Sequence, residues 1–198
     1  MQNQTYAAHF RPQIKSEALV YDIILIIGSS IFIALSAQIA FNVPFSPVPI
    51  TGQTFAVLLT GTLLGSCKGS LAVVAYLLEG ISGLPVFAQA QFGIIHLVGP
   101  TGGYLLGFIP VAFLCGLLVE VGWGKTIFGA LGIMAIGTVV IFICGLSWLK
   151  LFIGNNNVLN LGLYPYLFGA VIKISLAAIV YRVGWRVINK SGKNEAKE

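Results

Sequence analysis

Two long stretches of this chain, residues 23–67 and 80–119, contain no aspartate, glutamate, lysine or arginine. A run of about 18 or more uncharged, mainly apolar residues is long enough to cross a bilayer as a helix. Over the whole chain 57% of residues are hydrophobic and only 9% are charged, whereas a soluble domain carries about 25% charged residues. The chain therefore lacks the charge to cover a water-facing surface, and we expect an integral membrane protein built of helices.

Glycine, proline and charged residues divide the chain into six expected membrane-spanning helices. They are expected at about 21–41, 51–64, 70–80, 101–120, 126–152 and 164–183. The second and third are short for a bilayer core of roughly 30 Å, so flanking loop residues have to complete their depth. We expect the first span to be retained, because no small-residue cleavage site accompanies it. The prediction is one all-α membrane domain over residues 1–198, with an N-terminal arm at 1–20 and a basic tail at 184–198.

Basic residues indicate the orientation of the chain. All but two of the eleven lysines and arginines lie in the N-terminal arm, the turns at Lys68 and Lys125, or the C-terminal tail. The three other connections, at residues 44–49, 80–100 and 155–160, contain none. Basic residues next to spans favour the cytoplasmic side. We therefore expect both termini in the cytoplasm, in a multi-pass protein of the cell membrane, and these three connections on the outer face.

The outer connections are the irregular ones, and two of them are also apolar. One holds Pro44, Pro47 and Pro49, and another leads from Gly80 to Phe87. Irregular backbone at membrane depth is tolerated only where protein buries it or where it lines a cavity. We expect these connections to frame a pocket that opens to the outside. The alternative is that they are plain solvated loops.

Lys173 is expected near the middle of the last span. A lysine at the centre of a span costs roughly 2.5–3.5 kcal/mol on insertion scales. Its ammonium could snorkel to the interface, but that interface is about two turns away. It could instead face the bundle interior, where Glu79 is the only acidic residue expected near the outer face. We predict that Lys173 faces inward and binds the carboxylate of an incoming ligand.

Polar and small residues near the outer face supply further candidates. Thr51 opens the second span, where it either caps the helix or contacts a ligand. Gln53 in the first turn offers amide donors and an acceptor to a ligand. Gly102 and Gly103 either allow close helix packing or let the backbone approach a ligand.

The chain carries no recognisable catalytic constellation: no Ser/His/Asp set, no paired carboxylates and no phosphate-binding loop. Cys67, Cys115 and Cys144 lie far apart and are interpreted as buried free thiols. His9 and His96 are too far apart for an obvious metal site. We expect no enzyme activity, no cofactor and no bound metal. The basic tail indicates orientation and contact with anionic membrane lipid rather than nucleic-acid binding.

Three motifs resemble a known family. They are PVPITGQT at residues 47–54, GLPVF at 83–87 and GPTGGYLLGF at 99–108. In this order they resemble the biotin-specific substrate-binding subunits of energy-coupling-factor transporters, the BioY family, and the resemblance covers nearly the whole chain with its six spans. It implies a membrane subunit that captures biotin on the outer face.

The resemblance also implies partners. Family members work with a transmembrane coupling subunit and two cytoplasmic ATPase subunits, although some act without them. Their contact with the coupling subunit uses small residues of the first helix. In this sequence these fall on the pairs Ser30/Ala34 and Ser36/Ala40, which otherwise suit close helix contacts inside the protein.

The sequence departs from the family pattern in the pocket. Family members carry an aspartate three residues before the lysine, where Ala170 stands here, and a glycine-rich loop often with an arginine where this chain has glutamines. The full set of expected ligand contacts is Lys173, Gln53, Thr51, Tyr76, Glu79, Gln89, Gln91, Gly102 and Gly103. The expected ligand is biotin. The alternatives are another small carboxylate vitamin or precursor, or a membrane scaffold that does not transport.

Overall fold

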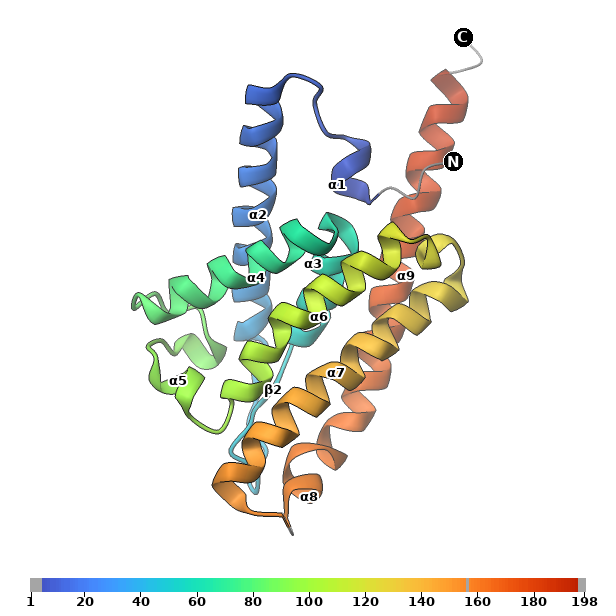
Figure 1. The fold of residues 1–198 in the computed structure, drawn as a ribbon. Helices are drawn as coiled ribbons and strands as arrows, with labels where there is room; N and C mark the ends of the chain where they lie inside the picture. The colour runs from blue at the N-terminus through green and yellow to red at the C-terminus, as the bar shows by residue number, and fades with distance from the viewer. Residues whose placement is uncertain (1–4, 156, 196–198) are drawn as a thin grey trace.

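The protein is a bundle of helices, seen here in a computed structural model that describes residues 5–155 and 157–195 (Figure 1). The longer helices are α2 (Lys15–Gln38), α3 (Gln53–Leu64), α4 (Ser66–Ile81), α6 (Gly102–Glu120), α7 (Ile127–Ile153) and α9 (Tyr164–Glu195). Short helices are α1 (Tyr6–His9), η1 (Ala88–Ala90), α5 (Ile95–Val98), η2 (Trp123–Lys125) and α8 (Val158–Gly162). In this described part, α2, α6, α7 and the stretch through α8 and α9 are long and apolar enough to cross a membrane. The expected helical membrane protein is confirmed at this level.

Helices α3 and α4 are short, and a single glycine separates them. The 12 residues of α3 extend about 18 Å at 1.5 Å per residue, less than the roughly 30 Å of a bilayer core. Gly65 has a φ of +91°, and a Cβ there would lie 2.5 Å from Glu120 Oε1. Glycine tolerates this backbone because it has no Cβ. The third helix therefore begins at Ser66, before the residue 70 predicted from sequence.

A β-hairpin connects α2 to α3. Strands β1 (Ala40–Phe41) and β2 (Ile50–Thr51) pair antiparallel, with Ala40 opposite Thr51. The hairpin replaces the last residues of the first predicted span, which ends at Gln38 instead of residue 41. In its proline-rich loop Ser46 Oγ donates a hydrogen bond to Leu161 O at 2.7 Å. The loop is thereby attached to the segment that leads into α9.

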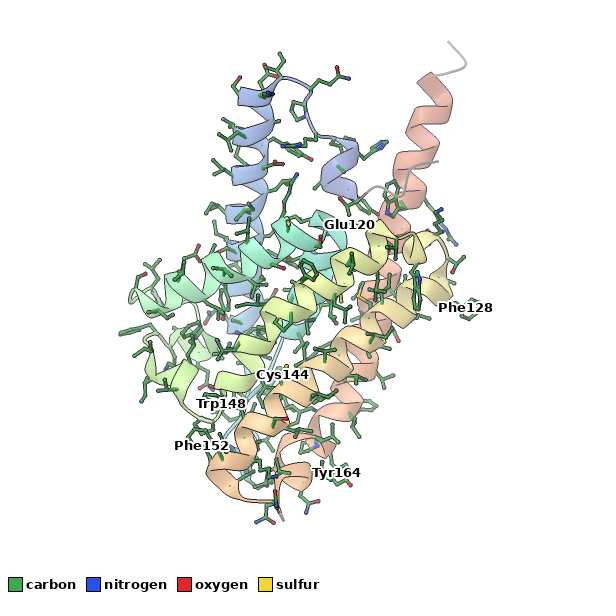
Figure 2. All side chains as sticks on the ribbon, in the orientation of Figure 1. Glu120, Phe128, Cys144, Trp148, Phe152 and Tyr164 are labelled. Atoms are coloured by element: carbon green, nitrogen blue, oxygen red, sulfur yellow. The ribbon has the colours of Figure 1, made fainter. Side chains whose placement is uncertain are left out.

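Helices α6 and α7 lie side by side through the middle of the bundle (Figure 1). Glycines of α6 face Cys144 and Trp148 of α7, both labelled in Figure 2. A Cβ on Gly103 would lie 2.2 Å from Trp148 Cβ, and one on Gly107 would lie 2.7 Å from Cys144 Cβ. Small residues thus allow the backbones to approach, as is common between helices in membranes.

The N-terminal helix α1 docks against the C-terminal part of α9 at one end of the bundle (Figure 1). Tyr6 donates a hydrogen bond from its hydroxyl to Tyr181 O at 2.5 Å, and its ring centroid lies 4.7 Å from that of Trp185. Helix α9 continues to Glu195, well past the predicted end at 183. Much of the predicted basic tail is therefore helical.

Basic side chains gather at this same end. Arg11 and Lys68 both pair with Asp22 of α2, Arg11 Nη2 at 2.8 Å from Asp22 Oδ2. Arg182 of α9 donates a hydrogen bond to Gly124 O in the α6–α7 connection at 3.1 Å. The N-terminal arm and both basic turns therefore share one end of the molecule.

Candidate ligand-binding site

A cavity of about 640 Å³ lies at the opposite end from α1, enclosed by segments from most of the chain. Its walls are the β-hairpin, the first turn of α3, the loop after α4, α5 with the start of α6, the second half of α7, and the first turns of α9. Small-molecule sites have volumes of about 300–1,000 Å³. The two apolar outer connections, at residues 44–49 and 80–100, therefore do line a pocket, whereas no described residue of the connection at 155–160 is part of the lining.

Lys173 enters this cavity from α9. Its Nζ donates hydrogen bonds to Thr51 O at 2.6 Å and to Thr54 Oγ1 at 3.1 Å, at the start of α3. The ammonium therefore points into the bundle and does not snorkel. Among the described residues that line the cavity, Lys173 is the only lysine or arginine, and no aspartate or glutamate is present. An ammonium has three donors, so one remains for a ligand.

Thr51 and Gln53 line the cavity next to Lys173, and their side chains are hydrogen-bonded to each other. Thr51 Oγ1 donates to Gln53 Oε1 at 2.9 Å, and Gln53 Nε2 donates to Tyr76 OH at 2.5 Å. Gln53 is only 5% exposed, so these bonds fix its amide orientation. One N–H of its amide is left to face a ligand. Tyr76 itself does not line the cavity; it holds Gln53 from behind.

Glu79, Gly102 and Gly103 also lie outside the cavity lining. Glu79 accepts a hydrogen bond from Ser30 Oγ of α2 at 2.5 Å. A Cβ on Gly102 would lie 1.7 Å from Leu97 O, and Gly103 packs against α7 as described above. In this geometry the three residues, like Tyr76, support the cavity walls and do not contact its interior.

Gln89 and Gln91 lie in the loop after α4, and both residues line the cavity. The loop is tightly folded because Phe87 N donates to Gln91 O at 3.0 Å. Gln89 and Ala90 have positive φ values of 59° and 56°, which are uncommon for residues other than glycine. Both glutamines are also exposed, so they lie where the cavity wall meets the surface of the molecule.

Sequence reasoning did not single out several residues of the cavity wall. Polar members include Asn42, Thr54, His96, Thr101, Thr138 and Tyr166, and apolar members include Phe87, Tyr104, Phe108, Phe142 and Phe152. Thr54, Phe87, Thr101, Tyr104 and Phe108 belong to the three motifs, so their motif positions could have indicated them. Residues of α7 such as Phe152, labelled in Figure 2, lie in no motif.

Comparison with known proteins decides the family. The sequence model of the BioY family matches residues 5–190. This chain belongs to the BioY family. Over 157 residues it is 39% identical to "Biotin transporter BioY" of Thermotoga maritima, covering 78% of this chain and 92% of the relative. It is 37% identical to "Probable biotin transporter BioY" of Pyrococcus horikoshii over 152 residues, 76% of this chain and 90% of the relative.

A solved structure has the same fold. The crystal structure of "the S-component for biotin from an ECF-type ABC transporter" superposes with a TM-score of 0.80 at 25% sequence identity. The match covers 87% of this chain and 95% of that one. The chain is thus a multi-pass membrane protein of a transporter family, and not a member of an enzyme family.

The small residues predicted to contact a partner are partly used within this BioY-family chain. Ser30 is fully buried against Glu79. Ser36 is also buried, and a Cβ on Gly52 would lie 2.5 Å from Ser36 O. Ala34 and Ala40 are half-buried. The serines therefore hold α2 to the rest of the bundle.

Proposed function

We propose that this chain binds biotin at the outer face of the cell membrane and delivers it across, as the S component of an energy-coupling-factor transporter. The observation that carries the proposal is the cavity, whose only lysine or arginine among its described lining residues is Lys173. Biotin has an apolar ring edge, a ureido group and one carboxylate. Apolar walls, amide side chains and a single ammonium match these three features.

The names of the relatives support biotin as the ligand. Proteins named biotin transporters span most of this chain, and the structural neighbour is named as an S component for biotin. The alternatives, another small carboxylate vitamin or a scaffold that does not transport, have no support in these comparisons.

The structural neighbour, named as an S component of an ECF-type ABC transporter, also supports the proposal that this chain works with partner subunits. Since the sequence has no phosphate-binding loop, we propose that two cytoplasmic ATPase subunits supply the energy and that a transmembrane coupling subunit connects them to this chain. Most of α2 faces outward: only 17% of its most apolar window is buried. A coupling subunit would meet this helix near the half-buried Ala34.

We propose that the chain crosses the membrane six times with both termini in the cytoplasm. Helices α2, α6, α7 and α9 supply the long spans, while α3 and α4 with their flanking hairpin and loop supply the two short ones. The basic end, with Arg11, Lys68 and Arg182, would then face the cytoplasm, and the cavity would open outward. The basic tail would lie near anionic lipid.

Calorimetry on the detergent-purified chain tests the function. We expect saturable binding of biotin, and a rise of the thermal unfolding midpoint with biotin concentration because a ligand that binds only the native state stabilises it. A panel of other vitamins serves as the control and should leave the midpoint unchanged. Stabilisation by another vitamin in place of biotin would contradict the proposal.

Thiol labelling in intact cells tests the orientation. In a variant without native cysteines, a cysteine at the exposed position Gln91 should react with an impermeant maleimide. A cysteine at the exposed position Lys125 should react only after the cells are permeabilised. The reverse pattern would overturn the orientation and, with it, an outward-facing cavity.

A further inference from the structure

The side chain of Gln38, the last residue of α2, is hydrogen-bonded to a loop that lines the cavity and is exposed at residues 89–91. Gln38 Nε2 donates to Phe87 O at 3.1 Å and to Val86 O at 3.4 Å, and Gln38 Oε1 accepts from Ala90 N at 2.8 Å. The same Nε2 also donates to Ala34 O at 3.1 Å, one turn back on α2. One amide therefore joins α2 to both ends of the segment 86–91, here called the lid loop.

The lid loop has a conformation that needs such support. Gln89 and Ala90 both have left-handed φ values. A residue other than glycine is strained in this region and persists there only when its surroundings fix it. Inside the loop, Phe87 N donates to Gln91 O at 3.0 Å and Gln91 N donates to Ala88 O at 3.3 Å. Gln38 accepts from the N–H of the peptide between the two strained residues and donates to the carbonyls of Val86 and Phe87 before them, and it thereby opposes relaxation of the pair.

The lid loop also forms part of the cavity. Phe87 is 2% exposed and Ala88 is 8% exposed, and both line the cavity together with Gln89 and Gln91. The Phe87 ring packs against Tyr76 and His96, with centroid distances of 5.6 and 5.9 Å. Movement of the loop away from α2 would expose Ala88 and withdraw both glutamines from the cavity.

We propose that Gln38 is a positioning residue that holds the lid loop closed and so sets how long a ligand stays in the cavity. Gln38 does not itself line the cavity; it acts through the backbone of Phe87 and Ala90. Its role in ligand release rests on the proposed function, whereas its role in closing the loop does not. A glutamine suits the position because one amide supplies donors and an acceptor together.

The closing role can be measured without a ligand. Cys67, Cys115 and Cys144 are replaced by alanine and Ala88 by cysteine, and the rate of reaction with a water-soluble thiol reagent is followed on the purified chain. We expect Gln38→Met, which has similar length but no hydrogen-bonding amide, to raise this rate roughly tenfold. Gln38→Glu retains the acceptor for Ala90 N–H but replaces the donor with an oxygen that faces the carbonyls of Val86 and Phe87, so it should also raise the rate.

A third variant changes a residue of the lid loop itself. Ala90→Gly removes the cost of a positive φ. It should therefore slow the labelling of the Ala88→Cys protein that retains Gln38, and it should partly reverse the faster labelling caused by Gln38→Met. Gln13→Met makes the same chemical change at an exposed position of the N-terminal arm and should change nothing. If Gln38→Met and Gln38→Glu both label at the parental rate, the proposal is overturned.

Ligand kinetics test the consequence for release. Gln38→Met should raise the dissociation rate of radiolabelled biotin roughly tenfold and leave its association rate within about twofold, because a closed lid slows release more than entry. An unchanged dissociation rate would overturn the role in residence time. If the wild-type chain binds no biotin, the proposed function fails, while a faster labelling rate in Gln38→Met would still establish Gln38 as the residue that closes the loop.

Discussion

Lys173→Met is expected to keep the fold and to weaken biotin binding about ten- to hundred-fold. A hydrogen bond to a charged group contributes about 1.5–3 kcal/mol net, and every 1.4 kcal/mol is a factor of about ten in affinity. Methionine is similar in length, apolar and tolerated in a span, so loss of the buried charge should not destabilise the ligand-free protein and could stabilise it. Calorimetry on the two purified proteins measures the effect.

Weaker biotin binding by Lys173→Met would have two causes, the loss of the contact with the ligand and the loss of contacts within the protein, and these have to be separated. Lys173 also binds Thr51 O and Thr54 Oγ1, so its removal could loosen the start of α3. A biotin analogue with the carboxylate converted to an amide separates the two causes. If the ammonium meets the carboxylate, the analogue should bind the wild type weakly and the variant about equally, since the two losses share one interaction. Additive losses would mean that the two groups do not touch.

A matched lysine provides the control for charge. Lys150 lies in α7 near the cavity end of the bundle, but it is exposed and does not line the cavity. Lys150→Met removes the same charge without touching the ligand, so its affinity should stay close to that of the wild type. Equal losses in both variants would indicate a general electrostatic effect. Unchanged binding in Lys173→Met would remove the main reason to expect an anionic ligand.

The membrane class and the main helices could be predicted because they depend on coarse quantities. Charge-free runs and glycine- or proline-rich breaks mark α6 and α7 to within about a residue. The break between α3 and α4 was harder, since it rests on the backbone conformation of one residue, Gly65. The C-terminal end of α9 was also missed. Charge predicts where the span leaves the membrane, but a helix can continue beyond that point.

The candidate site was only partly predictable, for a physical reason. Lys173, Gln53 and Thr51 stood out because polar groups in a span need partners. The wall formed by Phe142 and Phe152 did not, because lipid tails are as apolar as a protein core. On an apolar helix such as α7, the sequence alone does not distinguish the face that meets lipid from the face that meets a ligand.

The sequence also did not show where a glycine lets two helix backbones pack in direct contact. One such contact leads to the largest expected effect on stability. Gly116 of α6 crosses the break between α3 and α4, where a Cβ would lie 2.2 Å from Ser66 N and 2.3 Å from Gly65 C. These are backbone atoms, so no side chain can rotate away. Ser66 N also donates to Glu120 Oε1 at 2.8 Å, which fixes the break against α6 one turn further on.

Gly116→Ala should therefore force α6 away from this crossing. Overpacking of a core costs about 1–3 kcal/mol and occasionally more, and we expect the upper end, about 3 kcal/mol. At roughly 2–4 °C per kcal/mol for a chain of this size, the thermal unfolding midpoint in detergent should fall by about 6–12 °C. Gly132→Ala in α7 is the matched control, because a Cβ there has no atom within 4 Å. That variant should be neutral or slightly stabilised, since alanine favours a helix over glycine by about 1 kcal/mol. Equal midpoints for the two variants would mean that the close crossing of α6 over Gly65 and Ser66 does not limit the stability of the bundle.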